Sequence, residues 1–144
     1  ARRVVATGGN NVNKESPLID HCVVTVEYEN NVRATLLMCL FAENGSQLTI
    51  DVVGDKGRLI ARAVDQRLTF YDRGDAAPVE WSFEPGADGA FHMGFKTEHE
   101  SLVRSLCEDA PVVSTGPEAR ETMRVALAAE QAVDEGAIVD LAAE

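Results

Sequence analysis

The sequence predicts an α+β domain: an open, mainly antiparallel β-sheet of about six strands, followed by two helices that pack on one face of the sheet. Between residues 21 and 84, short runs alternate apolar and polar side chains with the period of two that is typical of strands. From residue 92 onward the apolar period lengthens to that of a helix. A chain of 144 residues is long enough for one domain with a stable core.

The first strands are expected to form a tight hairpin. The segment 21–29 alternates, Asn30 and Asn31 tolerate the positive φ of a two-residue turn, and the segment 32–41 returns. The return strand ends in the unbroken apolar run 36–41, which predicts that both of its faces are covered. The helices of the domain would cover one face, and the other cover must come from elsewhere.

The remaining elements follow in order. Further strands are expected at 47–53, 58–64, 67–71 and 79–83. The helix predicted over 92–109 gathers four residues on one face, namely Phe95, His99, Leu102 and Leu106. A second helix should begin at the capping box of Thr115 and Glu118 and end at a left-handed Gly136. Its small apolar face is predicted to be Ala119, Met123, Ala126, Ala129 and Val133, and 138–141 is a short extended finish.

Charge and cysteine content narrow the classes of partner. The chain carries 24 acidic and 13 basic residues, and a net charge of −11 repels phosphate backbones and anionic membrane surfaces. No apolar run approaches the ~18 residues of a membrane helix, so neither nucleic acid nor a membrane is expected as a partner. Three cysteines at unrelated spacings, Cys22, Cys39 and Cys107, predict reduced core thiols in a cytoplasmic protein.

The residues of the first helix are the best candidates for a binding site. His92 and His99 are seven positions apart, about 10 Å along a helix, so a shared metal ion is not expected. His99 could line a pocket or be a hydrogen-bonded core histidine, and His92, near the helix start, is expected to be exposed. Lys96 could bind a substrate oxygen or act as a base, although a solvated lysine is the commoner case.

No complete catalytic constellation is found in the chain. The glycine-rich turns at 8–11 and 54–57 lack the GxGxxG and GxxxxGK spacings that present backbone N–H groups to phosphates. The nucleophile and metal motifs GxSxG, HExxH and CxxC do not occur either. Arg58 and Arg62 share one strand face and could bind an anionic or polyol ligand, although a solvated sheet face is the commoner use of such residues.

Three segments in order resemble the C-terminal domain of the glucose-fructose oxidoreductase and inositol dehydrogenase family, also called Gfo/Idh/MocA. They are the acidic-led hairpin 20–36, the turn Val53-Gly54-Asp55-Lys56-Gly57-Arg58-Leu59, and the closing helix and strand 118–141. No single motif is specific, but their order and spacing extend over nearly the whole chain. Residues 1–144 are therefore expected to be a C-terminal substrate and oligomerisation domain.

The resemblance implies an NAD(P)-dependent dehydrogenase that acts on a sugar, inositol or related polyol. Its N-terminal Rossmann domain and its catalytic residues would precede Ala1, so no catalytic, cofactor-binding or metal residue is carried over and the fragment alone should be inactive. NAD or NADP is expected in the full-length protein and no cofactor in this fragment. The expected partners are the Rossmann domain and further copies bound through the free sheet face, and the segment 91–100, with His92, Lys96 and His99, would contribute to the substrate pocket. The alternative is a non-catalytic ligand-binding or assembly module of the same fold.

Overall fold

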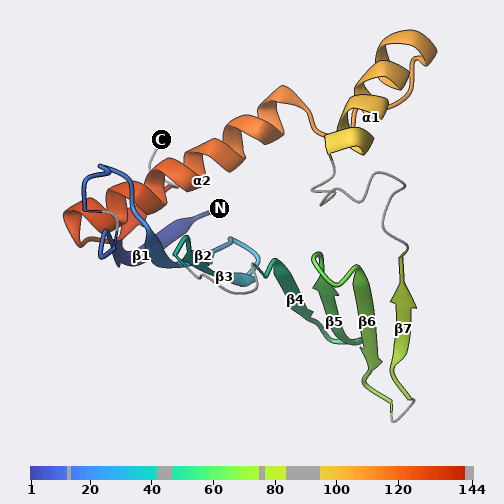
Figure 1. Cartoon of the computed structure of the whole chain (residues 1–144), viewed down its shortest axis with the longest axis horizontal. Coiled ribbons are helices and arrows are strands. Elements are labelled where there is room, and N and C mark those ends of the chain that lie inside the picture. Colours follow the sequence, from blue (N-terminus) through green and yellow to red (C-terminus); the bar gives the residue numbers. More distant parts are fainter. Residues whose placement is uncertain (13, 42–46, 75–76, 84–94, 142–144) are drawn as a thin grey trace. The chain divides into compact units, whose positions relative to one another are not determined.

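The computed structural model describes the chain except for residues 13, 42–46, 75–76, 84–94 and 142–144. The described residues form two compact units, Ala1–Ala42 with Ser114–Glu144 and Glu43–Val113, which we call the first and second unit. Eight strands and two helices are found in them (Figure 1): β1 Arg3–Gly9, β2 His21–Glu27, β3 Arg33–Cys39, β4 Thr49–Val53, β5 Gly57–Arg62, β6 Arg67–Asp72, β7 Val79–Ser82, α1 Phe95–Glu108, α2 Gly116–Glu135 and β8 Val139–Asp140.

The α+β class and the antiparallel pairing are confirmed, but the strands are arranged differently from the prediction. The described residues hold two four-stranded sheets, β3-β2-β1-β8 and β4-β5-β6-β7, in place of one sheet of about six strands. The sequence pattern shows which segments are extended but not which strands exchange hydrogen bonds, so the division into two sheets could not be read from it. That the chain forms one folding domain stays a prediction.

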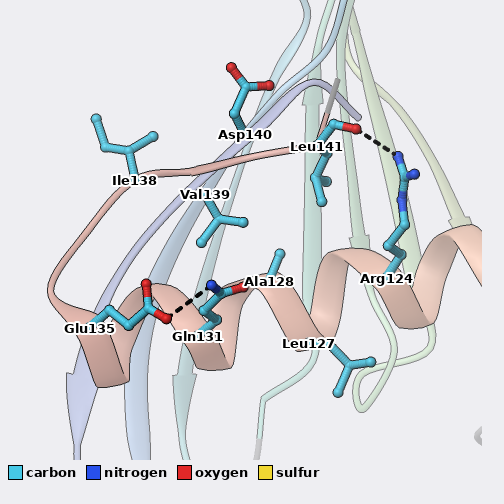
Figure 2. A pocket seen from close by; sticks show the side chains of 9 residues that line it. All are labelled: Arg124, Leu127, Ala128, Gln131, Glu135, Ile138, Val139, Asp140 and Leu141. Atoms are coloured by element: carbon cyan, nitrogen blue, oxygen red, sulfur yellow. Dashed lines mark hydrogen bonds between the residues drawn. The ribbon is translucent and has the colours of Figure 1, made fainter. Parts of the chain in front are cut away.

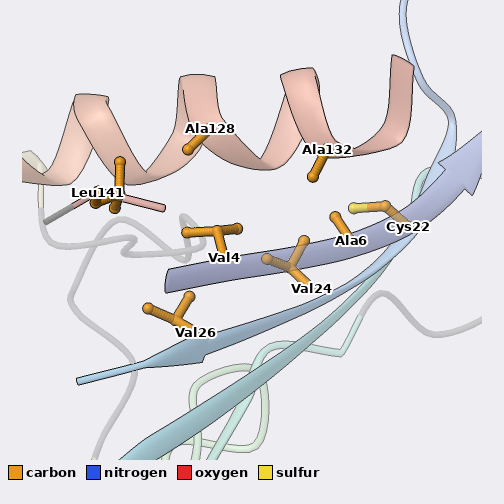
Figure 3. Close-up of a cluster of buried hydrophobic side chains, with 8 residues drawn as sticks. All are labelled: Val4, Ala6, Cys22, Val24, Val26, Ala128, Ala132 and Leu141. Carbon is orange, nitrogen blue, oxygen red and sulfur yellow. The ribbon is translucent and has the colours of Figure 1, made fainter. Parts of the chain in front are cut away.

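The core of the first unit lies between α2 and one face of its sheet. Figure 3 shows Ala128 and Ala132 pointing from α2 toward strand residues such as Val4 and Val24. The small alanines let the helix approach β1 closely, and both Val4 and Ala132 are 0% exposed. The rest of this core consists of Ala6, Cys22, Val26 and Leu141.

The helix α2 begins and ends where the sequence predicts, but it is rotated from the predicted face. Thr115 and Glu118 form the capping box, and Gly136 ends the helix at φ 62°. Packed against the sheet are Val125, Ala128, Ala129, Ala132 and Val133, whereas Met123 and Ala126 are exposed. Small alanines on several sides of the helix made its apolar face ambiguous in the sequence.

The β2–β3 hairpin has a three-residue loop, not the predicted two-residue turn. Tyr28 N–H donates to the Val32 carbonyl at 3.0 Å, and Asn31 N–H donates to the Tyr28 carbonyl at 3.1 Å. In this loop only Asn31 adopts a positive φ, 62°, which is the pattern of a type I turn followed by one left-handed residue.

The sheet of the second unit has two faces of different character. Cross-strand partners place one face entirely in apolar residues: Ile50, Val52, Leu59, Ala61, Leu68, Phe70, Val79 and Trp81. The opposite face carries Asp51, Arg58, Arg62, Arg67 and Glu80 around the buried Ile60 and Thr69. The shared face predicted for Arg58 and Arg62 is confirmed. The packing of α1 on a sheet stays a prediction.

Two expectations about burial are wrong: that a helix covers Leu36 on one face of the apolar run, and that all three cysteines are buried. Leu36 is on the same face as the core but is 57% exposed, because β3 is an edge strand and α2 packs on β1. Leu37, on the opposite face, is 75% exposed in the single chain, and its cover by another copy stays a prediction. Cys22 is a buried thiol, and burial raises its pKa, but Cys39 and Cys107 are exposed. Apolar neighbours in the sequence therefore did not predict burial, either on the edge strand β3 or on α1.

Candidate functional site

The structure brings two of the three predicted site residues close together. His92 lies outside the described residues, whereas Lys96 and His99 stand three positions apart on α1 and so on one side of the helix. The Lys96 side chain is 69% exposed, with its Nζ 3.9 Å from a Glu100 carboxylate oxygen. His99 is exposed, so the interpretation of His99 as a core histidine is wrong.

The apolar positions that accompany Lys96 and His99 are also open. Leu102 is 54% exposed and Leu106 is 76% exposed, on the same predicted helix face. Within the described part of α1, this side therefore combines a cation, an imidazole and uncovered leucines. Such a surface can line a pocket when another surface faces it, and this combination suits a ligand with both hydroxyl groups and carbon faces.

A second polar cluster is more completely built, and the sequence analysis missed it. The Asp20 side chain is only 7% exposed and accepts hydrogen bonds from the backbone N–H of Asn11, at 3.0 and 3.1 Å, and of Val12, at 2.8 Å. His21 Nδ1 lies 2.8 Å from the same carboxylate. The signal in the sequence was an adjacent Asp-His pair after an Asn-rich loop, at the start of a strand.

Three neighbouring side chains contact the imidazole ring of His21. With Nδ1–H donating to Asp20, Nε2 is left as an acceptor, and the Asn11 amide nitrogen lies 3.5 Å from it. The ring also meets Phe41 edge to face, with centroids 6.1 Å apart. This arrangement folds the loop between β1 and β2 back onto the sheet, so its described contacts are those of a structural clip.

A shallow pocket lies beside α2 in the first unit (Figure 2). Its volume is about 450 Å³, and its walls come from α2 and the segment 138–141. Arg124 reaches from the helix to the Leu141 carbonyl at 3.3 Å and approaches Glu121 at 3.4 Å, while its Nε is buried with no hydrogen-bond partner among the described residues. Gln131 donates to Glu135 at 3.0 Å across the far side. Arg124 therefore holds the segment after β8 against the helix.

Hydrogen bonds lower the pKa of three carboxylates in the described chain. A hydrogen bond from Arg3 lowers the pKa of Glu27, and Arg33 adds to this effect. On the second sheet, a two-pronged bond from Arg58 lowers the pKa of Asp51. The backbone N–H of Thr115 likewise lowers the pKa of Glu118 at the start of α2.

Among the described residues, neither glycine-rich turn opens a helix, and no cluster of metal ligands is found. Gly8 and Gly9 end a strand and the turn 54–57 joins two strands, so neither glycine pair opens a helix whose N-terminus would bind a pyrophosphate. At the N-terminus of α2 the Glu118 carboxylate already receives the free N–H of Thr115. Within the described ranges, no group of three or more His, Cys, Asp or Glu side chains could hold a metal ion.

The helices of the described chain are also too short or too polar to cross a membrane: neither α1 nor α2 holds a sufficiently long apolar window.

Comparisons with solved structures show the same fold in longer proteins. An oxidoreductase domain protein from Kribbella flavida is 18% identical over 97% of this chain, with a TM-score of 0.79. An oxidoreductase from Agrobacterium radiobacter in complex with NAD+, L-tartaric acid and magnesium is 16% identical over 99%, with a TM-score of 0.73. The WlbA dehydrogenase from Bordetella pertussis in complex with NADH and UDP-GlcNAcA is 16% identical over 97%, with a TM-score of 0.69.

These three proteins are much longer than this chain, which covers 44%, 44% and 40% of their respective lengths. No curated protein sequence matches the chain significantly. A sequence model of the family described as "Oxidoreductase family, C-terminal alpha/beta domain" (GFO_IDH_MocA_C) matches residues 2–141. Because the match spans almost every residue and agrees with the fold, the chain belongs to the C-terminal domain family of the Gfo/Idh/MocA oxidoreductases.

Proposed function

We propose that this chain is the substrate and oligomerisation domain of an NAD(P)-dependent dehydrogenase that acts on a sugar, inositol or related polyol. The observation that carries the proposal is the family match over residues 2–141. Solved proteins of the same fold, in complex with NAD+ or with NADH and UDP-GlcNAcA, support it. We place the dinucleotide on a separate N-terminal Rossmann domain, because the family match is to a C-terminal domain.

In this proposal, α1 supplies one wall of the substrate pocket. Lys96 donates hydrogen bonds to substrate hydroxyl oxygens, and His99 stands beside it on the helix and can donate or accept. The ion pair between Lys96 and Glu100 is long and exposed, so a polyol can replace it at little cost. His92 belongs to the same segment and stays a proposed contact.

Cofactor titration of the full-length protein tests the class of reaction. We expect NADH or NADPH to bind with a saturable change in nicotinamide fluorescence and a polyol to reduce NAD+ or NADP+. The upstream reading frame should hold a strand followed by GxGxxG. A full-length protein that binds neither dinucleotide would instead be a ligand-binding or assembly module of the same fold.

Variants of α1 test the proposed substrate wall. Lys96→Ala and His99→Ala in the full-length enzyme should each raise KM for the polyol by roughly tenfold with a smaller change in kcat, as expected when binding contacts are lost. Arg104→Ala is a matched control, because Arg104 lies on the same helix and pairs with Glu108 at 3.5 Å. If KM in the Lys96→Ala and His99→Ala variants equals that of the wild type and of the Arg104→Ala control, neither side chain contributes to the pocket.

We further propose that copies of the protein associate through a free sheet face. The face of the first sheet opposite α2 carries Val5, Val23 and Leu37, which are 36%, 43% and 75% exposed. Leu37→Lys should shift sedimentation of the full-length protein toward the monomer, whereas Leu127→Lys, on α2, should leave it unchanged. A wild-type protein that sediments as a monomer at high concentration would contradict this contact. The free thiols at Cys22, Cys39 and Cys107 favour the cytoplasm as its location.

A further inference from the structure

Two arginines face each other on the polar side of the second sheet. Arg62 on β5 and Arg67 on β6 are direct cross-strand partners. Such partners stand on the same face with Cβ atoms about 4.5–5.5 Å apart, and like charges at this spacing repel. Both side chains are exposed, and neither guanidinium forms an ion pair or a hydrogen bond with another described residue.

No carboxylate pairs with these two adjacent arginines among the described residues, although the chain holds 24 acidic and 13 basic residues. Five described arginines pair with carboxylates, namely Arg3, Arg33, Arg58, Arg104 and Arg124, whereas Arg2 and Arg120 of the first unit do not. Arg58, on the same face, binds Asp51 through two nitrogens at 2.9 and 2.5 Å. Arg58 is therefore already paired with a carboxylate. On the described strands of this face, Arg62 and Arg67 are the arginines without such a partner. The sequence had indicated Arg62 as a possible ligand-binding residue, but not Arg67.

Two hydroxyl side chains extend the arginine pair into a row. Thr49 is the cross-strand partner of Arg62, and Ser82 is the partner of Arg67. The row Thr49–Arg62–Arg67–Ser82 thus crosses all four strands with hydroxyl, guanidinium, guanidinium and hydroxyl groups on one face. We call it the arginine row.

Backbone hydrogen bonds hold the arginine row in register. Ala63 N–H donates to the Leu48 carbonyl at 2.9 Å, and Phe83 N–H donates to the Gln66 carbonyl at 3.0 Å. Both bonds lie just beyond the row at the end of the ladder. Together with the β5–β6 pairing, these bonds fix the backbone positions of the row without a ligand.

The nearest acids on this face do not neutralise the row. Glu80 lies on the diagonal from Arg67, where cross-strand neighbours are about 7–8 Å apart, and no ion pair joins the two within the described residues. Asp51, in the same row as Glu80, is already bound to Arg58. A compact anion can bind locally here, whereas a long polyanion would meet the net charge of −11.

We propose that the arginine row binds a phosphate-type oxyanion, such as the phosphate group of a small sugar phosphate. Each guanidinium fork can donate two hydrogen bonds to oxygens of the group, and the two flanking hydroxyls can donate to the outer oxygens. The ligand removes the repulsion between the arginines. The proposed phosphate site does not rest on the proposed hydride transfer. Its test uses neither a dinucleotide nor the other domain, so the two proposals can fail separately.

Titration of the 144-residue chain with inorganic phosphate, followed by NMR at constant ionic strength, tests the site. We expect saturable shifts of the amide and Nε signals of Arg62 and Arg67. Glucose 6-phosphate should give the same shifts and glucose none, which separates recognition of the phosphate from recognition of the sugar. The double variant Arg62→Gln/Arg67→Gln should bind roughly tenfold more weakly or not at all, because charge-assisted bonds supply the affinity.

A charge-matched control is the double variant Arg2→Gln/Arg120→Gln, which removes two exposed arginines of the first unit and should leave binding within about twofold of wild type. If the Gln variant does not fold, Arg62→Lys/Arg67→Lys keeps the charge, loses the forks and should bind with intermediate strength. Absent or non-saturable shifts in the wild type, or equal loss in the control, would overturn the proposal. So would a Gln variant that only dissociates an oligomer in sedimentation, since the row would then be a subunit contact.

Discussion

Replacement of Asp20 by asparagine should destabilise the first unit by about 2–3 kcal/mol. The carboxylate is 7% exposed and accepts hydrogen bonds from the backbone N–H of Asn11 and Val12 and from His21. Bonds to a charged group contribute about 1.5–3 kcal/mol each, and a buried donor left without a partner costs about 1–3 kcal/mol. The introduced side-chain amide keeps one acceptor oxygen but turns an NH₂ group toward donors, so about one of these bonds is lost with its donor unsatisfied.

Urea unfolding followed by far-ultraviolet circular dichroism measures this loss, because α2 belongs to the first unit whereas Trp81 fluorescence would report on the second. We expect a lower midpoint with an unchanged slope, and faster hydrogen exchange at Asn11 and Val12. Asp55→Asn, at an exposed turn, makes the same chemical change and should shift stability by less than about 0.5 kcal/mol. If Asp20→Asn behaves like this control and exchange at the two amides does not change, the clip is not a stabilising contact.

Three further substitutions probe other parts of the fold. The hydrogen bond from Arg3 lowers the pKa of Glu27, so the charged carboxylate stabilises the fold above the ordinary pKa of about 4.5. This stabilisation is lost as the pH falls through the lowered pKa of the folded state. Glu27→Gln should therefore make the free energy of unfolding less dependent on pH in this acidic range. Ala132→Leu should overpack the α2 interface and cost about 1–3 kcal/mol in urea unfolding, whereas Gln131→Leu, exposed beside it, should not. Gly57→Ala should lower the thermal midpoint of the second unit by several degrees, because φ is 155° and an added Cβ would collide with the backbone of β6; an unchanged midpoint would contradict that geometry.

Much of the local structure followed from the sequence because short-range physics determines it. The capping box at Thr115 and the left-handed Gly136 each depend on interactions within a few residues, and both are confirmed. The period of two likewise located the strands β2 to β7 to within a few residues. By contrast, the rotation of α2 depends on which alanines meet β1, and a helix with alanines on several sides does not specify this.

The predicted site illustrates the same limit. Lys96 and His99 were chosen from their spacing on one helix, and spacing does place them side by side on α1. Burial was predicted from the apolar residues around them, and this failed for His99, because an amphipathic helix shows which side avoids water but not what covers it.

The Asp20 clip and the arginine row were missed for a further reason: each depends on contacts between residues that the sequence separates. The Asp20 carboxylate accepts hydrogen bonds from the backbone N–H groups of Asn11 and Val12, and the sequence does not show that the loop brings these groups to it. Arg67 becomes the neighbour of Arg62 only because the β5–β6 register pairs them, and a shift of one residue would move one of the two to the apolar face. Once the register is known, the repulsion between the two arginines becomes apparent, and it points to an anionic ligand at this face. Phosphate titration and the Gln double variant can therefore test the pairing register and the ligand together.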